Sequence, residues 1–380
     1  MSTPTLYRAI ADLPLTIESV GLRRRARDTS SGFERVSTTF RLRGDGELGR
    51  GEDVTYDAPD HDALFAHPER DPRTTAEGVE FADAFAGDWT FREFSTHLDD
   101  VDLFPAGEPE RETAYPYRRW AVESAAMDLA LRQSDTDLAS ILGRERDPVS
   151  FAASTRLGEP QSESGTDSES RAAQPRGPTA DRVTAIAERV PGIGFKLDPT
   201  DDWTDEVVAD LPTEQVRVLD LKGLYEGTEV DQEPTPEFYE WVLESFPNAV
   251  IEDPAITDET RGVFAGDEHR VSWDYPITGV ASVEDLPWEP EWLNVKPSRF
   301  GTLESLSDTL EWARERDVTL YGGGQFELGV GRDQLHALAS VFYPEGPNDV
   351  APGAFNDPAV PERLPGTPLA PSAAPRGFEF

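Results

Sequence analysis

The stretch Val216-Arg-Val-Leu-Asp-Leu-Lys-Gly223 is a short apolar run that ends in charged residues. It predicts a buried strand over 216–221, and a helical segment at 205–209 precedes it. The same alternation of helix and strand extends along the chain in both directions. Further strands are expected at 149–157, 194–197, 249–252, 271–273, 292–295 and 319–321, and further helices at 180–190, 237–246, 283–286, 303–316 and 331–343. Repeated βα units imply parallel strands, and about seven or eight of them close into a barrel.

The N-terminal part has a different order of predicted strands and helices. Antiparallel strands are expected at 15–22 and 35–43, with a turn at Gly44-Asp45-Gly46. Helical periodicity follows at 60–66, 76–85 and 118–132. This part is therefore an α+β unit that leads through a long amphipathic helix into the barrel.

Two segments lack the pattern of a packed domain. Residues 158–178 are rich in Ser, Glu, Gly and Pro and have almost no apolar side chain, so we expect a disordered insertion there. Residues 346–380 are rich in proline and are expected to return over the surface.

Carboxylates dominate the composition. The chain has 35 Lys and Arg against 74 Asp and Glu, a formal net charge of −39. The acidic residues are spread over the whole length. They indicate either an acidic face for a basic partner or, as we favour, a halophilic protein kept hydrated by surface carboxylates in a salty cytoplasm. Nucleic acid is not an expected partner, because phosphate contacts need clustered Lys and Arg.

Cysteine is absent, which excludes disulfides, thiolate metal sites and a cysteine nucleophile. The sequence has no secretion signal and no apolar stretch long enough to cross a membrane. We therefore expect a soluble cytoplasmic protein without a membrane partner.

Lysine is rare, and its placement indicates an active site. The only lysines are Lys196, Lys222 and Lys296, and each lies in a short apolar run that predicts a buried strand. A surface lysine is a solvated charge, whereas a buried lysine has a pKa that its surroundings can tune.

Charged side chains also gather at the predicted strand ends, where barrels carry their functional groups. Three of them, Asp220, Glu252 and Asp274, come from neighbouring strands and form an oxygen-only set suited to Mg²⁺. Such an ion stabilises the charge that forms when a proton leaves the carbon next to a carboxylate. A flanking lysine can act as the acid or base.

Several segments, taken in order, resemble the enolase superfamily and specifically its mandelate racemase and muconate-lactonizing branch. They are Arg41-Leu-Arg-Gly-Asp-Gly-Glu-Leu-Gly-Arg-Gly-Glu52, Ala121-Val-Glu-Ser-Ala-Ala-Met-Asp-Leu-Ala-Leu131, Asn294-Val-Lys-Pro-Ser-Arg-Phe-Gly301 and Gly329-Val-Gly331 after Glu327. The spacing of the three carboxylates fits as well. The resemblance implies a modified TIM (β/α) barrel with an N-terminal α+β capping domain. We assign residues 1–117 to the capping domain, 118–345 to the barrel, and 346–380 to a tail returning to the cap.

The sequence departs from the family pattern at several positions. Asp198 stands where the family usually carries a second lysine on the second barrel strand, and Lys222 stands where it carries asparagine. Tyr275 replaces a common glutamate. No histidine lies near the seventh strand, so a histidine base is not expected. Asp198 and Lys222 look like an exchanged pair, in which the lost lysine reappears on the neighbouring strand.

The resemblance implies a Mg²⁺-dependent isomerase or lyase that removes the α-proton of a small carboxylate substrate. Cycloisomerase, epimerase and o-succinylbenzoate-synthase-like dehydratase reactions all fit. Asp220, Glu252 and Asp274 would hold the metal, Lys296 would be the acid/base, and Lys222 or Lys196 would complete the pair. The alternative is a non-catalytic enolase-like protein in which Lys222 replaces the metal.

Weaker candidates for substrate contact are Glu327, Asp198 and Arg156. Glu327 is equally a candidate for capping the next helix, and Arg156 is as much a candidate for an ordinary surface arginine. The resemblance also favours a homo-oligomer.

Overall fold

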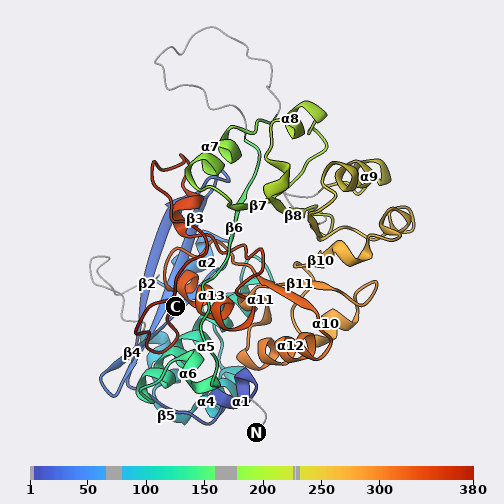
Figure 1. Ribbon diagram of the computed structural model, residues 1–380. Helices are drawn as coiled ribbons and strands as arrows, with labels where there is room; N and C mark the ends of the chain where they lie inside the picture. Colours follow the sequence, from blue (N-terminus) through green and yellow to red (C-terminus); the bar gives the residue numbers. More distant parts are fainter. Residues whose placement is uncertain (1–3, 66–78, 159–177, 226, 228–231) are drawn as a thin grey trace.

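The computed structural model describes residues 4–65, 79–158, 178–225, 227 and 232–380. The predicted insertion at 158–178 lies, except for its two end residues, outside the described part of the chain. Figure 1 shows a long antiparallel sheet on one side of the molecule and a curved set of shorter strands and helices on the other.

The strands are β1 (Pro14–Ile17), β2 (Ser19–Asp28), β3 (Glu34–Gly44), β4 (Glu47–Asp53), β5 (Gly87–Thr90), β6 (Ala152–Thr155), β7 (Gly194–Leu197), β8 (Val216–Asp220), β9 (Val250–Glu252), β10 (Val271–Trp273), β11 (Trp292–Val295) and β12 (Thr319–Gly322). The α-helices are α1 (Leu6–Ile10), α2 (Ala58–Ala63), α3 (Val79–Phe85), α4 (Phe91–His97), α5 (Ala114–Gln133), α6 (Leu138–Leu142), α7 (Asp181–Arg189), α8 (Asp205–Ala209), α9 (Pro236–Ser245), α10 (Val280–Glu284), α11 (Pro297–Phe300), α12 (Leu303–Glu315) and α13 (Val330–Phe342).

The N-terminal unit is built on the antiparallel sheet β2-β3-β4. The predicted turn joins β3 to β4, with Asp45 at φ 50° and Gly46 at φ 78°, the left-handed pair of a tight hairpin. Two glycines of β4 let the long helix α5 lie directly on this sheet. A Cβ at Gly51 would lie 2.0 Å from the Ala121 carbonyl oxygen, and one at Gly49 would lie 2.2 Å from that of Ala125. The glycine-rich segment is therefore a helix-packing surface.

The second unit is a parallel sheet of seven strands in the order β12-β11-β10-β9-β8-β7-β6. Two residues close the gap between its edges. Asn348 forms a bridge to Phe151 beside β6, and Asp349 forms one to Gly323 beside β12. The Ala152 N–H donates to the Asn348 carbonyl at 2.9 Å, and the Asp349 N–H donates to the Gly322 carbonyl at 2.7 Å. The predicted modified barrel with an N-terminal α+β domain is confirmed, with a two-residue segment in the eighth strand position.

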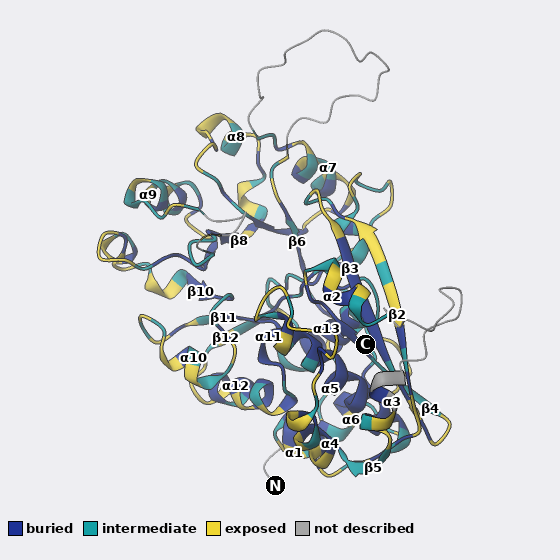
Figure 2. Ribbon diagram, turned by 180° about the vertical axis from the view of Figure 1, so that it is seen from behind, coloured by how far each residue is buried: buried dark blue, intermediate teal, exposed yellow. Residues whose placement is uncertain are grey.

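Three outer helices of the barrel, α8, α9 and α12, begin within one residue of the predicted position, and a threonine precedes each of them. Thr204, Thr235 and Thr302 accept the N–H groups of the third helical residue in α8, α9 and α12. Helix α5 starts earlier than the expected residue 118, and it is buried along nearly its whole length between the two units (Figure 2).

The C-terminal segment lies against the N-terminal unit. The Ser30 N–H donates to the Asn356 carbonyl at 2.8 Å, Arg27 pairs with Asp357, and Arg376 Nη2 lies 3.0 Å from Glu47 Oε1. Within the described ranges, no helix has the length and apolar character needed to cross a bilayer.

Candidate active site

Three carboxylates meet at one end of the barrel. Asp220 ends β8, Glu252 ends β9, and Asp274 directly follows β10; these strands are neighbours in the sheet. All three side chains are fully buried, and one oxygen of each lies within 4.8 Å of the other two. The structure therefore brings together the set that the strand ends predict.

Four cationic side chains contact this carboxylate triad. The Lys196 ammonium contacts Glu252 and lies 3.2 Å from Asp220 Oδ2, and the Lys222 ammonium also contacts Asp220 Oδ2. Lys296 Nζ lies 2.8 Å from Asp274 Oδ2, and Arg299 Nε lies 3.2 Å from Asp274 Oδ1. All three lysines of the chain therefore belong to one cluster.

The buried charged groups shift one another's pKa values in different directions. Burial raises the pKa of Asp220, but the ammonium groups of Lys222 and Lys196 outweigh it and hold that pKa far below its usual value. Burial likewise opposes Arg299 and Lys296 at Asp274, whose pKa falls to about 2. At Glu252 burial dominates over the attraction of Lys196 and raises the pKa to about 8. Glu252 is thus the least compensated carboxylate of the triad.

Lys196 lies deepest of the lysines. Its side chain is 1% exposed, and besides Glu252 and Asp220 its ammonium lies 3.4 Å from Asp349 Oδ2. Burial lowers the pKa of Lys196, but these carboxylates outweigh that effect and raise it well above the usual value. This environment suits a fixed positive charge that orients carboxylates.

Lys296 reaches the triad from the next strand along the sheet. It directly follows β11 and precedes the short helix α11. Its side chain passes over Gly323, where a Cβ would lie 2.6 Å from Lys296 Cε and 2.5 Å from Asn294 Oδ1. Glycine at the exit of β12 therefore leaves the space through which Lys296 reaches Asp274.

Lys222 reaches Asp220 through a turn of the backbone. β8 ends at Asp220, and Lys222, two residues further on, has a left-handed φ of 53°. Its N–H donates to Asp220 Oδ1 at 3.2 Å, so the carboxylate binds both ends of the same residue. The Lys222 ammonium also lies 3.9 Å from Asp198 Oδ1, and Arg156 Nε donates to Asp198 Oδ2 at 3.1 Å. The departures at Asp198 and Lys222 are thus neighbours in space.

Sequence reasoning missed four residues that contact the cluster. Asn294 Nδ2 donates to Glu252 Oε2 at 3.0 Å, the Tyr321 hydroxyl donates to the same oxygen, and Arg299 and Asp349 pair as described above. Asn294 could have been found, because it lies two residues before Lys296 on a strand and so shares its face. Asp349 could not, since two residues show no strand periodicity.

The N-terminal unit covers the mouth of the barrel beside this cluster. The Tyr56 hydroxyl donates to Gln325 Oε1 at 2.7 Å, and Gln325 Nε2 donates to the Tyr117 hydroxyl at 3.3 Å. The rings of Phe33 and Phe326 meet edge to face at 5.4 Å. Phe326 has a left-handed φ of 58°, a conformation that bulky residues rarely adopt. The loop after β12 is therefore held by aromatic contacts from the cap.

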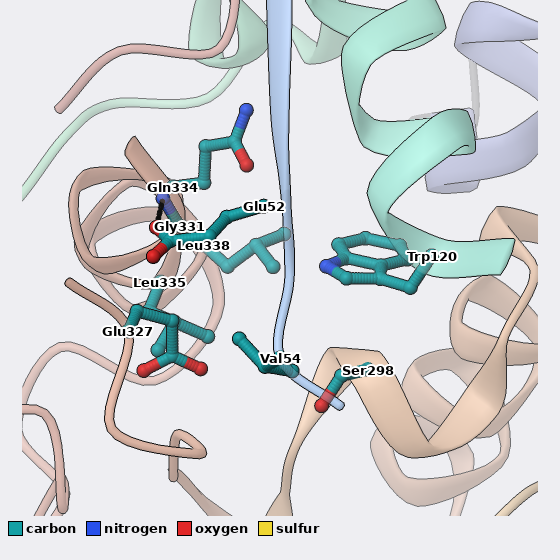
Figure 3. Close-up of a pocket in the computed structure, with 9 residues that line it drawn as sticks. All are labelled: Glu52, Val54, Trp120, Ser298, Glu327, Gly331, Gln334, Leu335 and Leu338. Carbon is teal, nitrogen blue, oxygen red and sulfur yellow. Dashed lines mark hydrogen bonds between the residues drawn. The ribbon is translucent and has the colours of Figure 1, made fainter. Parts of the chain in front are cut away.

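Glu327 does not cap the helix that follows it. The carboxylate of Glu52, from β4, accepts the N–H groups of Leu328, Gly329 and Gly331 at the start of α13. Figure 3 shows the bond to Gly331. Glu327 Oε1 instead accepts the Gln325 N–H at 2.7 Å. The capping interpretation of Glu327 is thus wrong, and its proposed contact with substrate stays a prediction.

The cavity beside Glu52 and Glu327 is too small to be a substrate site. Its volume is about 10 Å³, and it lies between β4, α5 and α13, lined by Trp120 and Leu338 among others (Figure 3). That volume suits a single water molecule.

Two family models match this chain. The C-terminal model of Domain of unknown function (DUF8230) covers residues 145–357, and its N-terminal model covers residues 8–141. The chain belongs to the DUF8230 family. A comparison with curated proteins finds no match.

Solved structures with the same fold as this DUF8230 protein come from the enolase superfamily. An unknown member from Enterococcus faecalis V583 is 19% identical with a TM-score of 0.59, over 90% of this chain and 88% of its own. Muconate cycloisomerase from Pseudomonas fluorescens is 17% identical with a TM-score of 0.57, over 89% and 87%. Dipeptide epimerase from Methylococcus capsulatus, complexed with Mg ion, is 17% identical with a TM-score of 0.55, over 86% and 88%. The predicted resemblance is confirmed, and at these identities it establishes the fold alone.

The carboxylate triad of the DUF8230 protein fits the divalent ion that this fold implies. All its donor atoms are carboxylate oxygens, the type that Mg²⁺ prefers, and they converge from three fixed strand ends. Among the described residues, Asn294 Oδ1 is buried without a hydrogen-bond donor, and buried Asp274 Oδ1 has the ion pair with Arg299 but no hydrogen bond. Asp220, Glu252 and Asp274 would hold the ion, and the ammonium of Lys222 would have to share or leave Asp220.

Proposed function

We propose that this protein is a Mg²⁺-dependent enzyme that removes a proton from the carbon next to a substrate carboxylate, with an isomerase or lyase outcome. The observation that carries the proposal is the order of groups around the barrel mouth: a carboxylate at the C-terminal end of each of β8, β9 and β10, then Lys296 at the end of β11. When bound, Mg²⁺ supplies the positive charge that a carboxylate substrate needs as its α-proton leaves.

The three lysines would have different roles, either proton transfer or positioning of the carboxylates. Lys296, 8% exposed and next to Asp274, is placed to take or return the proton at its Nζ. Lys222, 15% exposed, is the candidate for a second acid/base. Lys196 holds Glu252 and Asp220 in place. Tyr56 of the cap and Gln325 of the loop after β12 would exclude water and contact the substrate, and Glu327, Asp198 and Arg156 remain candidates for that contact.

The rival function is a non-catalytic binding protein in which the Lys222 ammonium takes the place of the metal. The contact between Lys222 and Asp220 is the observation that favours it. The two functions differ in whether a divalent ion binds and whether an α-proton exchanges.

Exchange of the α-proton with solvent deuterium tests the proposal. A panel of carboxylates, including dipeptides and the lactone product of muconate cycloisomerisation, would be incubated with the protein in D₂O, molar KCl and Mg²⁺, and followed by ¹H NMR. We expect exchange of at least one compound that requires Mg²⁺ and disappears in Lys296→Gln. Exchange that survives in Lys296→Gln, or that is independent of Mg²⁺, would contradict the assigned roles.

A further inference from the structure

Lys222 has two carboxylates within reach of one ammonium group. It contacts Asp220 Oδ2 and lies 3.9 Å from Asp198 Oδ1. Asp220 belongs to the carboxylate triad, whereas Asp198 lies beyond the end of β7 and outside that triad. The side chains of Lys222 and Asp198 are both 15% exposed, so the space between them borders solvent.

A divalent ion on the triad changes the balance between these two partners. Asp220 Oδ2 contacts Lys222 and lies 3.2 Å from Lys196, so an ion held by this carboxylate would have two ammonium groups close by. Repulsion between like charges is strong at such distances in a buried site, because little solvent screens them. At least one of the two ammonium groups must withdraw for the ion to bind well.

Lys196 is poorly placed to withdraw. It is 1% exposed, and Glu252 and Asp349 hold its ammonium in addition to Asp220. Lys222 is free of such additional anchors on the triad, and its nearest alternative carboxylate, Asp198, is fixed by Arg156 at 3.1 Å. The backbone under Lys222 is pinned, since the Gly223 N–H donates to the Asp253 carbonyl at 3.1 Å and a Cβ at Gly223 would lie 2.5 Å from the Ala255 nitrogen. The movement available is therefore a swing of the side chain.

We propose that Lys222 is a mobile counter-ion, which neutralises Asp220 in the metal-free protein and moves to Asp198 when Mg²⁺ binds. The inference rests on the proposed metal site and adds a role for Asp198, that of a receiving carboxylate. It explains why the two departures from the family pattern occur together. Asp198 without Lys222 would receive no cation from the triad and would pair with Arg156 alone, and Lys222 without Asp198 would compete with the metal for Asp220.

The scarcity of lysine makes this movement directly observable. Protein labelled with ¹³C at lysine Cε gives three side-chain signals, which Lys222→Gln and Lys296→Gln assign. On titration with Mg²⁺ in molar KCl, we expect the Lys222 signal to shift with saturation and to shift much less in Asp198→Asn. A Lys222 signal that stays in place while the metal binds would overturn the proposal.

Metal affinity, measured by calorimetry on the same variants, gives a second readout. Asp198→Asn should weaken Mg²⁺ binding by about tenfold, the scale seen when a group behind a metal ligand is lost. Lys222→Gln should bind Mg²⁺ at least as tightly as the wild type, because a competing charge is gone. The matched control is Asp201→Asn, which removes one exposed carboxylate from the same loop. Equal affinities in Asp198→Asn and Asp201→Asn, or weaker binding in Lys222→Gln, would overturn the inference.

A different set of binding results would refute the metal site on which this inference rests. If Mg²⁺ binds equally to wild type and Glu252→Gln, or binds only when Lys222 is replaced, the metal site itself is refuted and the swing with it. If the wild type binds one ion that Glu252→Gln loses, while Asp198→Asn behaves as Asp201→Asn, the metal site stands and only the role of Asp198 is refuted.

Discussion

Replacing Glu52 with glutamine should loosen the cap from the barrel. The Glu52 side chain is 2% exposed and accepts three backbone N–H groups at the start of α13, with Leu328 N at 2.7 Å and Gly331 N at 2.8 Å, as well as the Ser37 hydroxyl at 2.6 Å. Oε1 accepts from Leu328 and Ser37, Oε2 accepts from Gly331, and the Gly329 N–H lies 3.0 Å from both oxygens. Glutamine keeps one oxygen and places an NH₂ group against N–H donors at the other.

The cost follows from these contacts. One buried N–H without an acceptor costs about 1–3 kcal/mol, and losing a negative charge at a helix N-terminus costs about 0.3–1 kcal/mol. Burial and the nearby Glu327 raise the pKa of Glu52, so the neutral amide recovers part of that loss. We expect the free energy of unfolding to fall by about 1–3 kcal/mol, a range set by the buried-hydrogen-bond term.

Urea denaturation at constant KCl, followed by tryptophan fluorescence, measures this change. The matched control is Glu47→Gln on the same strand, which removes an ion pair with Arg376 whose two side chains are 28% and 51% exposed. Such a pair contributes about 0–1 kcal/mol. If Glu52→Gln were no less stable than Glu47→Gln, the hydrogen bonds from α13 to Glu52 would not hold the cap on the barrel.

Two further predictions concern packing and pH. Gly51→Ala places a Cβ 2.0 Å from the Ala121 carbonyl oxygen and should destabilise the fold by about 3 kcal/mol. Its control, Gly262→Ala, has open space around the new Cβ and should stay within about 0.5 kcal/mol of wild type. Equal denaturation midpoints for the two variants would contradict the packing of α5. Burial lowers the pKa of His336 to about 4, so the unfolded chain takes up its proton at a higher pH than the folded one and stability is lost as pH falls from the unfolded value toward 4. Between pH 7.5 and 5 the wild type should lose about 2 kcal/mol more than His336→Gln, and parallel stability curves for the two proteins would show that His336 is not buried as described.

The sequence predicted the barrel strands because each is a short apolar run, and these runs alternate with helical segments along the chain. It predicted the convergence of Asp220, Glu252 and Asp274 because carboxyl ends of parallel strands meet on one side of a sheet. It missed the features that depend on contacts far apart in the chain. Asp349 comes from a two-residue bridge without periodicity, and the carboxylate that accepts the N–H groups at the start of α13 belongs to Glu52, 279 residues before Gly331.

Local rules also failed where the backbone leaves regular structure. Lys222 follows the end of β8 with a left-handed φ, in a turn that no propensity of lysine favours. A non-glycine residue in that region is uncommon and marks a conformation that its surroundings must stabilise. The contact with Asp220 at both its N–H and its ammonium supplies that stabilisation.

Manganese binding in molar KCl tests the central claim most directly. Electron paramagnetic resonance would count bound Mn²⁺ in wild type and in Glu252→Gln, which removes the least compensated charge of the triad and controls for diffuse binding to a surface with a net charge of −39. We predict one saturable site in the wild type that Glu252→Gln lacks and that Mg²⁺ displaces. Identical binding in the two proteins would contradict the metal site and leave Lys222 as the permanent occupant of Asp220.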